Sequence, residues 1–234
     1  MIPLEPVSLD TKLFFLSAVE FGSRLFLGPG EGDDAAWLEL VTQGPAELAN
    51  MLPDDRSPSP DGDTDFAIPA LLARLTGRDA DRSARELQHE FVRLFISAKG
   101  GAPVPPYESC HPASGVPCDK APSPTMGPAA QAMRERLAAV GLGVGLPGNE
   151  PPDHLGLELE YLVYLLAKGW FGGQPDKLPL AGAFCREVLA AWLPVFHARL
   201  CGADRTGVFA AASAVILAVV RGLSDLLPGA PRPA

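Results

Sequence analysis

Apolar residues along this chain recur mostly at helical spacing. In the segment 79–97, for example, Leu87, Phe91, Leu94 and Phe95 fall at positions i, i+4, i+7 and i+8 of one helical face. Strand-like alternation of apolar and polar residues is scarce, and the valines lie mostly within helical stripes. The pattern therefore predicts an all-α protein, folded as a single-domain helical bundle.

Glycine, proline and capping residues indicate where the helices begin and end. Ser8 is a suitable N-cap for the first helix, and Asp153 and Asp204 are expected to cap two later ones. Pro194 is expected to bend the helix in which it lies. The expected helices cover 8–27, 34–52 (as one helix, or as two broken at Gly44-Pro45), 65–76, 79–97, 126–140, 153–171, 179–200 and 204–227.

The length of 234 residues suits one domain, which we expect to cover 1–234. A proline-rich loop over 99–124 divides it into an N-terminal subregion, 1–98, and a C-terminal subregion, 125–234. The longest uncharged apolar run, 206–220, has 15 residues. Because a bilayer needs about 20, this run predicts a buried core helix and no stable membrane insertion.

Composition narrows the choice of compartment and partner. The start, MIPLEPVSLD, lacks the basic residues of a secretory signal, and four cysteines are too few for a disulfide scaffold. We therefore expect a cytoplasmic protein. With 19 Lys and Arg against 28 Asp and Glu, the formal charge is -9. This charge disfavours nucleic acid as a partner and favours a cationic one.

Two apparent motifs lack the context that their chemistry needs. The segment 143–148 reads GVGLPG, but a dinucleotide site requires a strand before such glycines and a helix directly after them. Cys110, His111 and Cys118 do not have the close spacing of zinc ligands. Nothing local supports a Cys–His nucleophilic pair. The residues alone thus indicate no reaction centre, metal or cofactor.

The segment 105–109, PPYES, has the chemistry of a binding loop. Two prolines hold the backbone extended, which would fix Tyr107 and Glu108 at little cost in entropy. An aromatic ring beside a carboxylate suits an arginine guanidinium, which can stack and form a bidentate hydrogen bond. The alternative is a stiff surface loop whose tyrosine plugs the edge of the core.

The segment 150–166, EPPDHLGLELEYLVYLL, predicts a capped helix with a leucine core stripe. A neighbouring stripe carries His154, Glu158, Tyr161 and Leu165. His154 and Glu158 can pair, which would raise the pKa of the histidine. This stripe is either the polar seam of a core helix or an acidic lip beside an apolar groove.

Four segments, taken in order, resemble the signatures of the TorD/DmsD/NarJ family of redox-enzyme maturation chaperones. They are EFVRLF at 90–95, PPYES at 105–109, EPPDHLGLELEYL at 150–162 and WLPVF at 192–196. Their order and approximate spacing agree with the family over about 90–200. The chain departs from the family pattern at 110–112, where Cys-His-Pro replaces an aliphatic residue and an aromatic one.

The resemblance implies a cytoplasmic, non-enzymatic, all-helical chaperone without a cofactor, as a monomer or a domain-swapped dimer. Its partner would be the catalytic subunit of a dimethyl-sulfoxide-reductase-type molybdenum or tungsten enzyme, with that subunit's twin-arginine leader. It would delay export until the metal cofactor is inserted. An acidic protein with an apolar groove suits a leader that is basic and then apolar. The expected site residues are Leu94, Phe95, Pro106, Tyr107, Glu108, Ser109, Asp153, His154, Glu158 and Tyr161.

Two alternatives remain open at this point. One is a NarJ-like assembly factor for a reductase subunit that is not exported. The other is an enzyme, either a nucleotide hydrolase or a cysteine-dependent one; nucleotide binding has been suggested for a few family members. The receptor-site hypothesis requires the loop around Tyr107 and the helix that opens near Asp153 to lie on the same side of the molecule.

Overall fold

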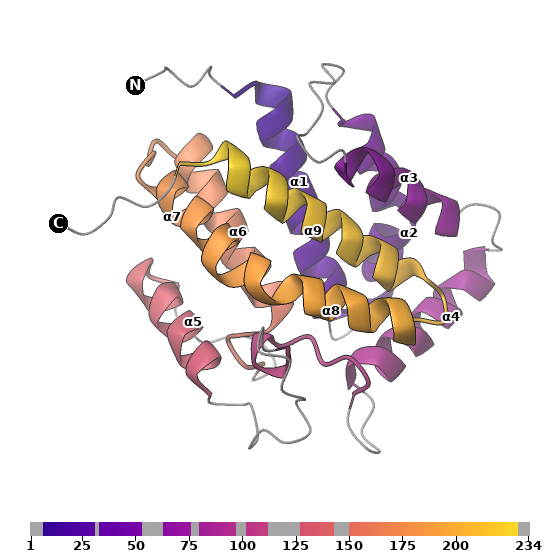
Figure 1. The fold of residues 1–234 in the computed structure, drawn as a ribbon. Helices are drawn as coiled ribbons and strands as arrows, with labels where there is room; N and C mark the ends of the chain where they lie inside the picture. The colour runs from indigo at the N-terminus through magenta and orange to yellow at the C-terminus, as the bar shows by residue number, and fades with distance from the viewer. Residues whose placement is uncertain are drawn as a thin grey trace.

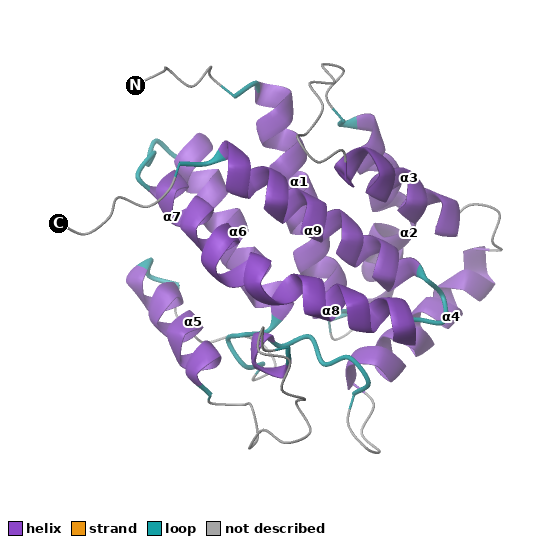
Figure 2. Ribbon diagram, viewed as in Figure 1, coloured by secondary structure: helices purple, strands orange, loops and turns teal. Residues whose placement is uncertain are grey.

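The computed structural model describes residues 7–30, 33–52, 63–75, 80–96, 102–111, 127–142 and 150–228. Within these ranges the chain forms helices joined by loops, and it has no strand (Figure 2). Tyr107 and His154 form an isolated antiparallel β-bridge. The predicted all-α helical bundle is confirmed. The helices are α1 Leu9–Leu27, α2 Asp34–Asn50, α3 Asp63–Leu75, α4 Ala80–Phe91, α5 Pro128–Ala139, α6 Leu155–Trp170, α7 Lys177–Phe184, α8 Ala190–Ala203 and α9 Val208–Leu226.

Three short helical turns complete the described structure. A π-helical turn, Val92–Ile96, extends α4, and another, Cys185–Leu189, joins α7 to α8. A 3-10 turn, Glu108–Cys110, lies in the proline-rich loop. The segment that we expected over 179–200 is thus one helical run whose middle is widened by a π-turn.

The helix ends follow the sequence signals closely. Ser8 caps α1, and its Oγ accepts a hydrogen bond from Thr11 N at 3.1 Å. Pro45 lies inside a continuous α2, so the single-helix alternative holds. The assignment of Asp204 as the N-cap of α9 is wrong, because Gly207 occupies that position. The Asp204 carboxylate still satisfies an amide of the first turn, since its Oδ2 accepts a hydrogen bond from Ala210 N at 2.9 Å.

Helix α9 runs through the middle of the bundle, beside α8 and in contact with α1, α3 and α7 (Figure 1). By length and composition, Val208–Leu226 and the run Lys177–Ala203 could each cross a membrane. In the folded chain, however, 61% of the most apolar window of α9 is buried inside the protein. The prediction of a buried core helix over 206–220 is therefore confirmed.

An aromatic cluster joins the N-terminal and C-terminal helices in one hydrophobic core. The centroids of neighbouring rings lie between 5.1 and 6.5 Å apart. Most pairs meet edge to face, an arrangement that the quadrupoles of aromatic rings favour. The division into subregions 1–98 and 125–234 stays a prediction, but helices from both sides of it contribute rings to this core. The members are Phe26, Trp37, Phe91, Phe95, Phe196 and Phe209.

Helices α1 and α6 pack closely where a glycine opens α6. Ser23 Oγ donates a hydrogen bond to Gly156 O at 2.9 Å, and both residues are buried. A Cβ at Gly156 would stand 3.0 Å from Ser23 O and would collide with Leu27 Cγ. The absence of a side chain at this position therefore sets the distance between α1 and the start of α6.

We predict that Gly156→Ala destabilises the protein by about 1–3 kcal/mol, the usual cost of overpacking a close contact. Gly202→Ala is the matched control, because a Cβ at this exposed helical position meets nothing within 4 Å. The control should be neutral or stabilising by up to about 1 kcal/mol. Urea unfolding followed by circular dichroism measures both, and equal effects of the two variants would contradict this account of the helix contact.

Candidate functional site

Two signature segments, far apart in the sequence, are joined by backbone hydrogen bonds. Glu108 N donates to Asp153 O at 2.9 Å, and Leu155 N donates to Pro106 O at 2.8 Å. These bonds flank the bridge between Tyr107 and His154. The proline-rich loop thus lies against the start of α6, as the receptor-site hypothesis requires.

The start of α6 corrects two predictions. His154 is the N-cap, and its Nδ1 accepts from Gly156 N at 3.1 Å, so the assignment of Asp153 as the cap is wrong. The carboxylate of Asp153 turns instead to the loop, where Oδ2 accepts from Ser109 N at 3.2 Å. The expected rise in the pKa of His154 through Glu158 is also wrong, because burial lowers this pKa to about 4.

Three carboxyl groups gather where the loop meets α6, and we call Glu108, Asp153 and Glu158 the carboxyl cluster. Glu158 is completely buried, Asp153 is 1% exposed and Glu108 is half-buried. Trp192 Nε1 donates to Glu158 Oε2 at 3.1 Å. From the described residues, Oδ1 of Asp153 and Oε1 of Glu158 are buried and receive no hydrogen bond from an N–H or hydroxyl donor. Asp153 Oδ1 is therefore a buried acceptor without a donor in this part of the chain.

The cluster holds at least one proton more tightly than free carboxyls would. Burial raises the pKa of Glu158 well above its ordinary value, the nearby Glu108 and Asp153 carboxyls raise it further, and the Trp192 N–H opposes the shift. Burial also raises the pKa of Glu108, while a hydrogen bond with Glu158 and the charge of Arg136 lower it. Because two carboxyls can hydrogen-bond only when one is protonated, the deeper Glu158 carries the shared proton.

Aromatic side chains pack around the residues that flank the carboxyl cluster. Tyr107 donates from its hydroxyl to Glu150 Oε2 at 2.7 Å, and its ring packs edge to face against His154. His111 stacks on Trp192 and holds Pro105 O at 2.6 Å from its Nε2. Burial lowers the pKa of His111 to about 4, so its imidazole is neutral near pH 7. Where the chain departs from the family pattern with Cys-His-Pro, it thus has a neutral, buried histidine ring against Trp192.

The remaining predicted site residues lie in the core and not on an open groove. Leu94 is fully buried and Phe95 is 6% exposed within the aromatic cluster. Pro106 is buried, and the Tyr161 ring packs edge to face on Phe184. The exposed apolar side chains of the same π-helical turn are Val92 and Ile96, 49% and 60% exposed. Of the two alternatives for the stripe of His154, Glu158, Tyr161 and Leu165, the structure therefore agrees with the polar seam of a core helix, because all four residues are buried.

Sequence reasoning missed two structural residues of the site region. Trp192 was expected only as part of the WLPVF segment, yet it is the hydrogen-bond donor to Glu158. Glu90 binds Arg93 Nε at 2.7 Å and accepts from Arg205 N at 2.6 Å, which ties the end of α4 to the turn between α8 and α9. Burial favours a higher pKa for Glu90, but these hydrogen bonds outweigh it and the pKa is lowered.

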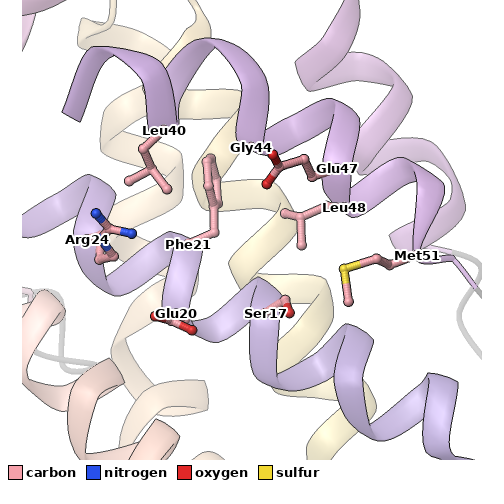
Figure 3. A pocket seen from close by; sticks show the side chains of 9 residues that line it. All are labelled: Ser17, Glu20, Phe21, Arg24, Leu40, Gly44, Glu47, Leu48 and Met51. Atoms are coloured by element: carbon pink, nitrogen blue, oxygen red, sulfur yellow. The ribbon is translucent and has the colours of Figure 1, made fainter. Parts of the chain in front are cut away.

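Away from the carboxyl cluster, a hollow lies between α1 and α2 (Figure 3). Exposed Glu20, Arg24 and Glu47 edge an apolar floor that includes Phe21 and Leu48. Among the described residues, none that lines the hollow shares a hydrogen bond with the carboxyl cluster, and none has a buried side-chain donor or acceptor without a partner. Its chemistry does not single out a ligand.

The structure offers no support for a metal among the residues that it describes. Within them, no three His, Cys, Asp or Glu side chains are arranged to hold an ion. Cys110 and His111 are buried, whereas Cys118 and the GVGLPG segment lie outside the described residues.

We predict that the protein loses stability as the pH falls from about 6.5 towards 4. The unfolded state takes up a proton at His154 near pH 6.5, whereas the folded state resists until about pH 4. Proton uptake at His154 in the unfolded state then lowers the free energy of unfolding by about 2 kcal/mol at pH 5. His154→Asn keeps a capping acceptor and cannot titrate, so its stability should fall less between pH 7 and 5. Urea unfolding at several pH values measures the difference.

The matched control is His89→Gln, because His89 is exposed on α4. This variant should keep the full pH dependence of the original protein, to which His111 also contributes. If His154→Asn keeps that dependence as well, the neutral histidine cap is not what acid disrupts.

Comparison with known proteins identifies the family. Residues 57–198 match the family model described as nitrate reductase delta subunit, and all four signature segments lie in this range. Chaperone protein TorD of Vibrio cholerae is 30% identical over 148 residues, which are 62% of this chain and 63% of that protein, just under two thirds of its length. TorD of Vibrio vulnificus is 31% identical over 156 residues, 64% of this chain and 68% of the relative.

Among solved structures, a candidate redox enzyme maturation protein from Archaeoglobus fulgidus aligns with a TM-score of 0.46 and 19% identity, over 86% of this chain and 91% of that one. The sequence match alone covers more than half of the present chain. The chain therefore belongs to the nitrate reductase delta subunit family, which includes the TorD- and NarJ-type proteins.

Proposed function

We propose that this protein is a cytoplasmic maturation chaperone for a molybdenum or tungsten bis-pterin oxidoreductase. It binds the twin-arginine leader of the catalytic subunit, or the cofactor-free subunit itself, and delays export until the cofactor is inserted. The observation that carries the proposal is the family match over 57–198, together with curated relatives named as TorD chaperones. No reaction centre and no cofactor of its own form part of it.

The carboxyl cluster supplies chemistry suited to the arginines of such a leader. A guanidinium carries five N–H donors in a planar fork, and carboxylate oxygens are its preferred acceptors. The half-buried Glu108 is the accessible member, and Asp153 Oδ1 is a buried acceptor that receives no hydrogen bond from the described residues. Glu158 becomes an acceptor for an arginine only when it gives up the proton that it shares with Glu108. An arginine that enters past Glu108 would donate hydrogen bonds to these carboxyl groups.

The energy available suits a reversible complex. A micromolar complex has a binding free energy of about -8 kcal/mol, which a few apolar anchors and two charge-assisted hydrogen bonds can supply. Leu94 and Phe95 are committed to the core, so we assign the first apolar contacts of the leader to the exposed Val92 and Ile96 on the same turn. A moderate affinity lets the leader pass on to the export machinery.

The family description also favours a second candidate, a NarJ-like assembly factor for a reductase subunit that stays inside the cell. Such a factor would bind the cofactor-free subunit equally well with or without a leader. Comparing its affinity for the two forms of the subunit distinguishes the two functions.

We predict that Glu108→Gln and Asp153→Asn each weaken binding of a twin-arginine leader peptide about tenfold. Each substitution removes one charge-assisted hydrogen bond, worth about 1.5–3 kcal/mol, and changes the shape of the site little. Isothermal titration calorimetry with the leader of the neighbouring reductase subunit measures the change.

Glu160→Gln is the matched control, because Glu160 is an exposed carboxylate on the same helix as Glu158. It should bind with the original affinity. A peptide with lysines in place of both arginines should bind more weakly, since an ammonium lacks the planar fork. If neither leader peptide nor cofactor-free subunit binds the unmodified protein, the proposed function is wrong.

We also predict that arginine binding releases a proton. Glu158 is protonated in the free protein, and pairing with a guanidinium favours its ionised form. Affinity should therefore rise with pH as long as Glu158 of the free protein still holds its proton, by at most about tenfold per unit. Calorimetry in buffers of different ionisation enthalpy counts the protons released.

Glu158→Gln keeps an acceptor for Trp192 Nε1 and cannot ionise, so it should release no proton and show little pH dependence. If the unmodified protein binds the peptide without releasing a proton, Glu158 is not an arginine partner, although the chaperone function would stand.

A further inference from the structure

Helix α5 places a guanidinium close to the carboxyl cluster. Arg136 Cζ lies 5.7 Å from the centroid of the Phe184 ring on α7, in a cation–π contact. The Phe184 ring packs edge to face on Tyr161, at a centroid distance of 5.0 Å. Tyr161 follows Glu158 by three positions on α6, so the two side chains share one face of that helix. Two aromatic rings in contact thus connect Arg136 to the stripe that carries Glu158.

The same helix also reaches the accessible carboxyl group of the cluster. Helix α5 contacts the 3-10 turn Glu108–Cys110 (Figure 1). Burial raises the pKa of Glu108, whereas a hydrogen bond with Glu158 and the charge of Arg136 lower it. Burial raises the pKa of Tyr161 as well, and the charge of Arg136 opposes that shift. Glu108 therefore has a cation of its own chain nearby before any leader arrives.

The Arg136 side chain can move while α5 stays in place. Among the residues that the structure describes, Arg136 shares no hydrogen bond or salt bridge, and it is half-buried. The helix is anchored by other residues. Met133 and Leu137 are buried, and the Tyr164 hydroxyl donates to Val140 O at 3.3 Å. A guanidinium on a long, flexible side chain can therefore leave the cluster without detaching the helix.

A leader arginine and Arg136 have the same chemistry. Two guanidinium cations beside one carboxylate repel each other, so both cannot pair with Glu108 at full strength. We propose that Arg136 is an internal competitor of the leader, which lies beside Glu108 in the free protein and moves away when a leader arginine binds. This inference rests on the proposed function.

Such a competitor would make the site selective. A single arginine of another protein offers Glu108 only the interaction that Arg136 already supplies. A twin-arginine leader adds a second arginine and an apolar segment, which together can outweigh the loss of Arg136 from the site. Competition from within the chain therefore disfavours incomplete ligands more than it disfavours the leader.

The test is isothermal titration calorimetry of the full-length protein with the leader peptide of the neighbouring reductase subunit. In Arg136→Gln the dissociation constant should fall at least about fivefold, as expected if Arg136 blocks Glu108 in about four of five free molecules. Arg134→Gln is the matched control, because Arg134 is exposed on the same helix and carries the same charge. It should change the dissociation constant less than about twofold, since salt screens exposed charges.

A second background shows whether Arg136 acts through Glu108. In Glu108→Gln the further substitution Arg136→Gln should tighten binding less than about twofold, because the shared partner is gone. If Arg136→Gln binds no more tightly than Arg134→Gln, or if its gain is undiminished in Glu108→Gln, the competitor role is wrong while the chaperone function stands. If the peptide binds none of these proteins, the proposed function is wrong and the competitor role falls with it.

Discussion

The site depends on one constraint, which is the pair of backbone hydrogen bonds that holds the loop 106–108 against residues 153–155. Each bond joins groups that would otherwise lie buried without a partner, so the pairing of loop and helix is enforced locally. It brings Glu108 beside Asp153 and above Glu158, although these residues are about 50 positions apart in sequence. Without that pairing, the three carboxyl groups would have no reason to share a proton.

A buried acidic cluster lowers stability, and the surrounding structure offsets this cost only in part. Trp192 supplies one hydrogen bond to Glu158, and the amide of Ser109 supplies one to Asp153. Protonation of Glu158 removes one of the buried charges. Among the described residues no donor reaches Asp153 Oδ1, and an unsatisfied buried acceptor of this kind is uncommon in folded proteins.

Much of the fold follows from the sequence because helical periodicity and capping are local. The leucines 155, 159, 162 and 166 are all fully buried, as their spacing predicted. The π-turn at 185–189 could not be predicted, since it depends on how α7 and α8 pack against α9. The N-cap of α6 was predicted wrongly, as Asp153, for a related reason. Asp153 is an excellent N-cap residue, but the tertiary contact with Ser109 competed for its carboxylate and His154 took the cap.

The site was predicted less completely than the fold because burial depends on distant segments. Periodicity placed Glu158 and Tyr161 on one stripe, but this stripe is covered because Trp192 of α8 contacts Glu158 and Phe184 of α7 packs on Tyr161. Residues of the EFVRLF segment likewise differ in how deeply they are buried. Glu90 binds Arg93 and Phe95 lies in the core, whereas Val92, and Ile96 directly after the segment, face solvent. A signature shared across a family can therefore record both a scaffold and a binding surface. In this chain the scaffold residues are the larger share, and the half-buried Glu108 is the most accessible carboxyl group of the cluster.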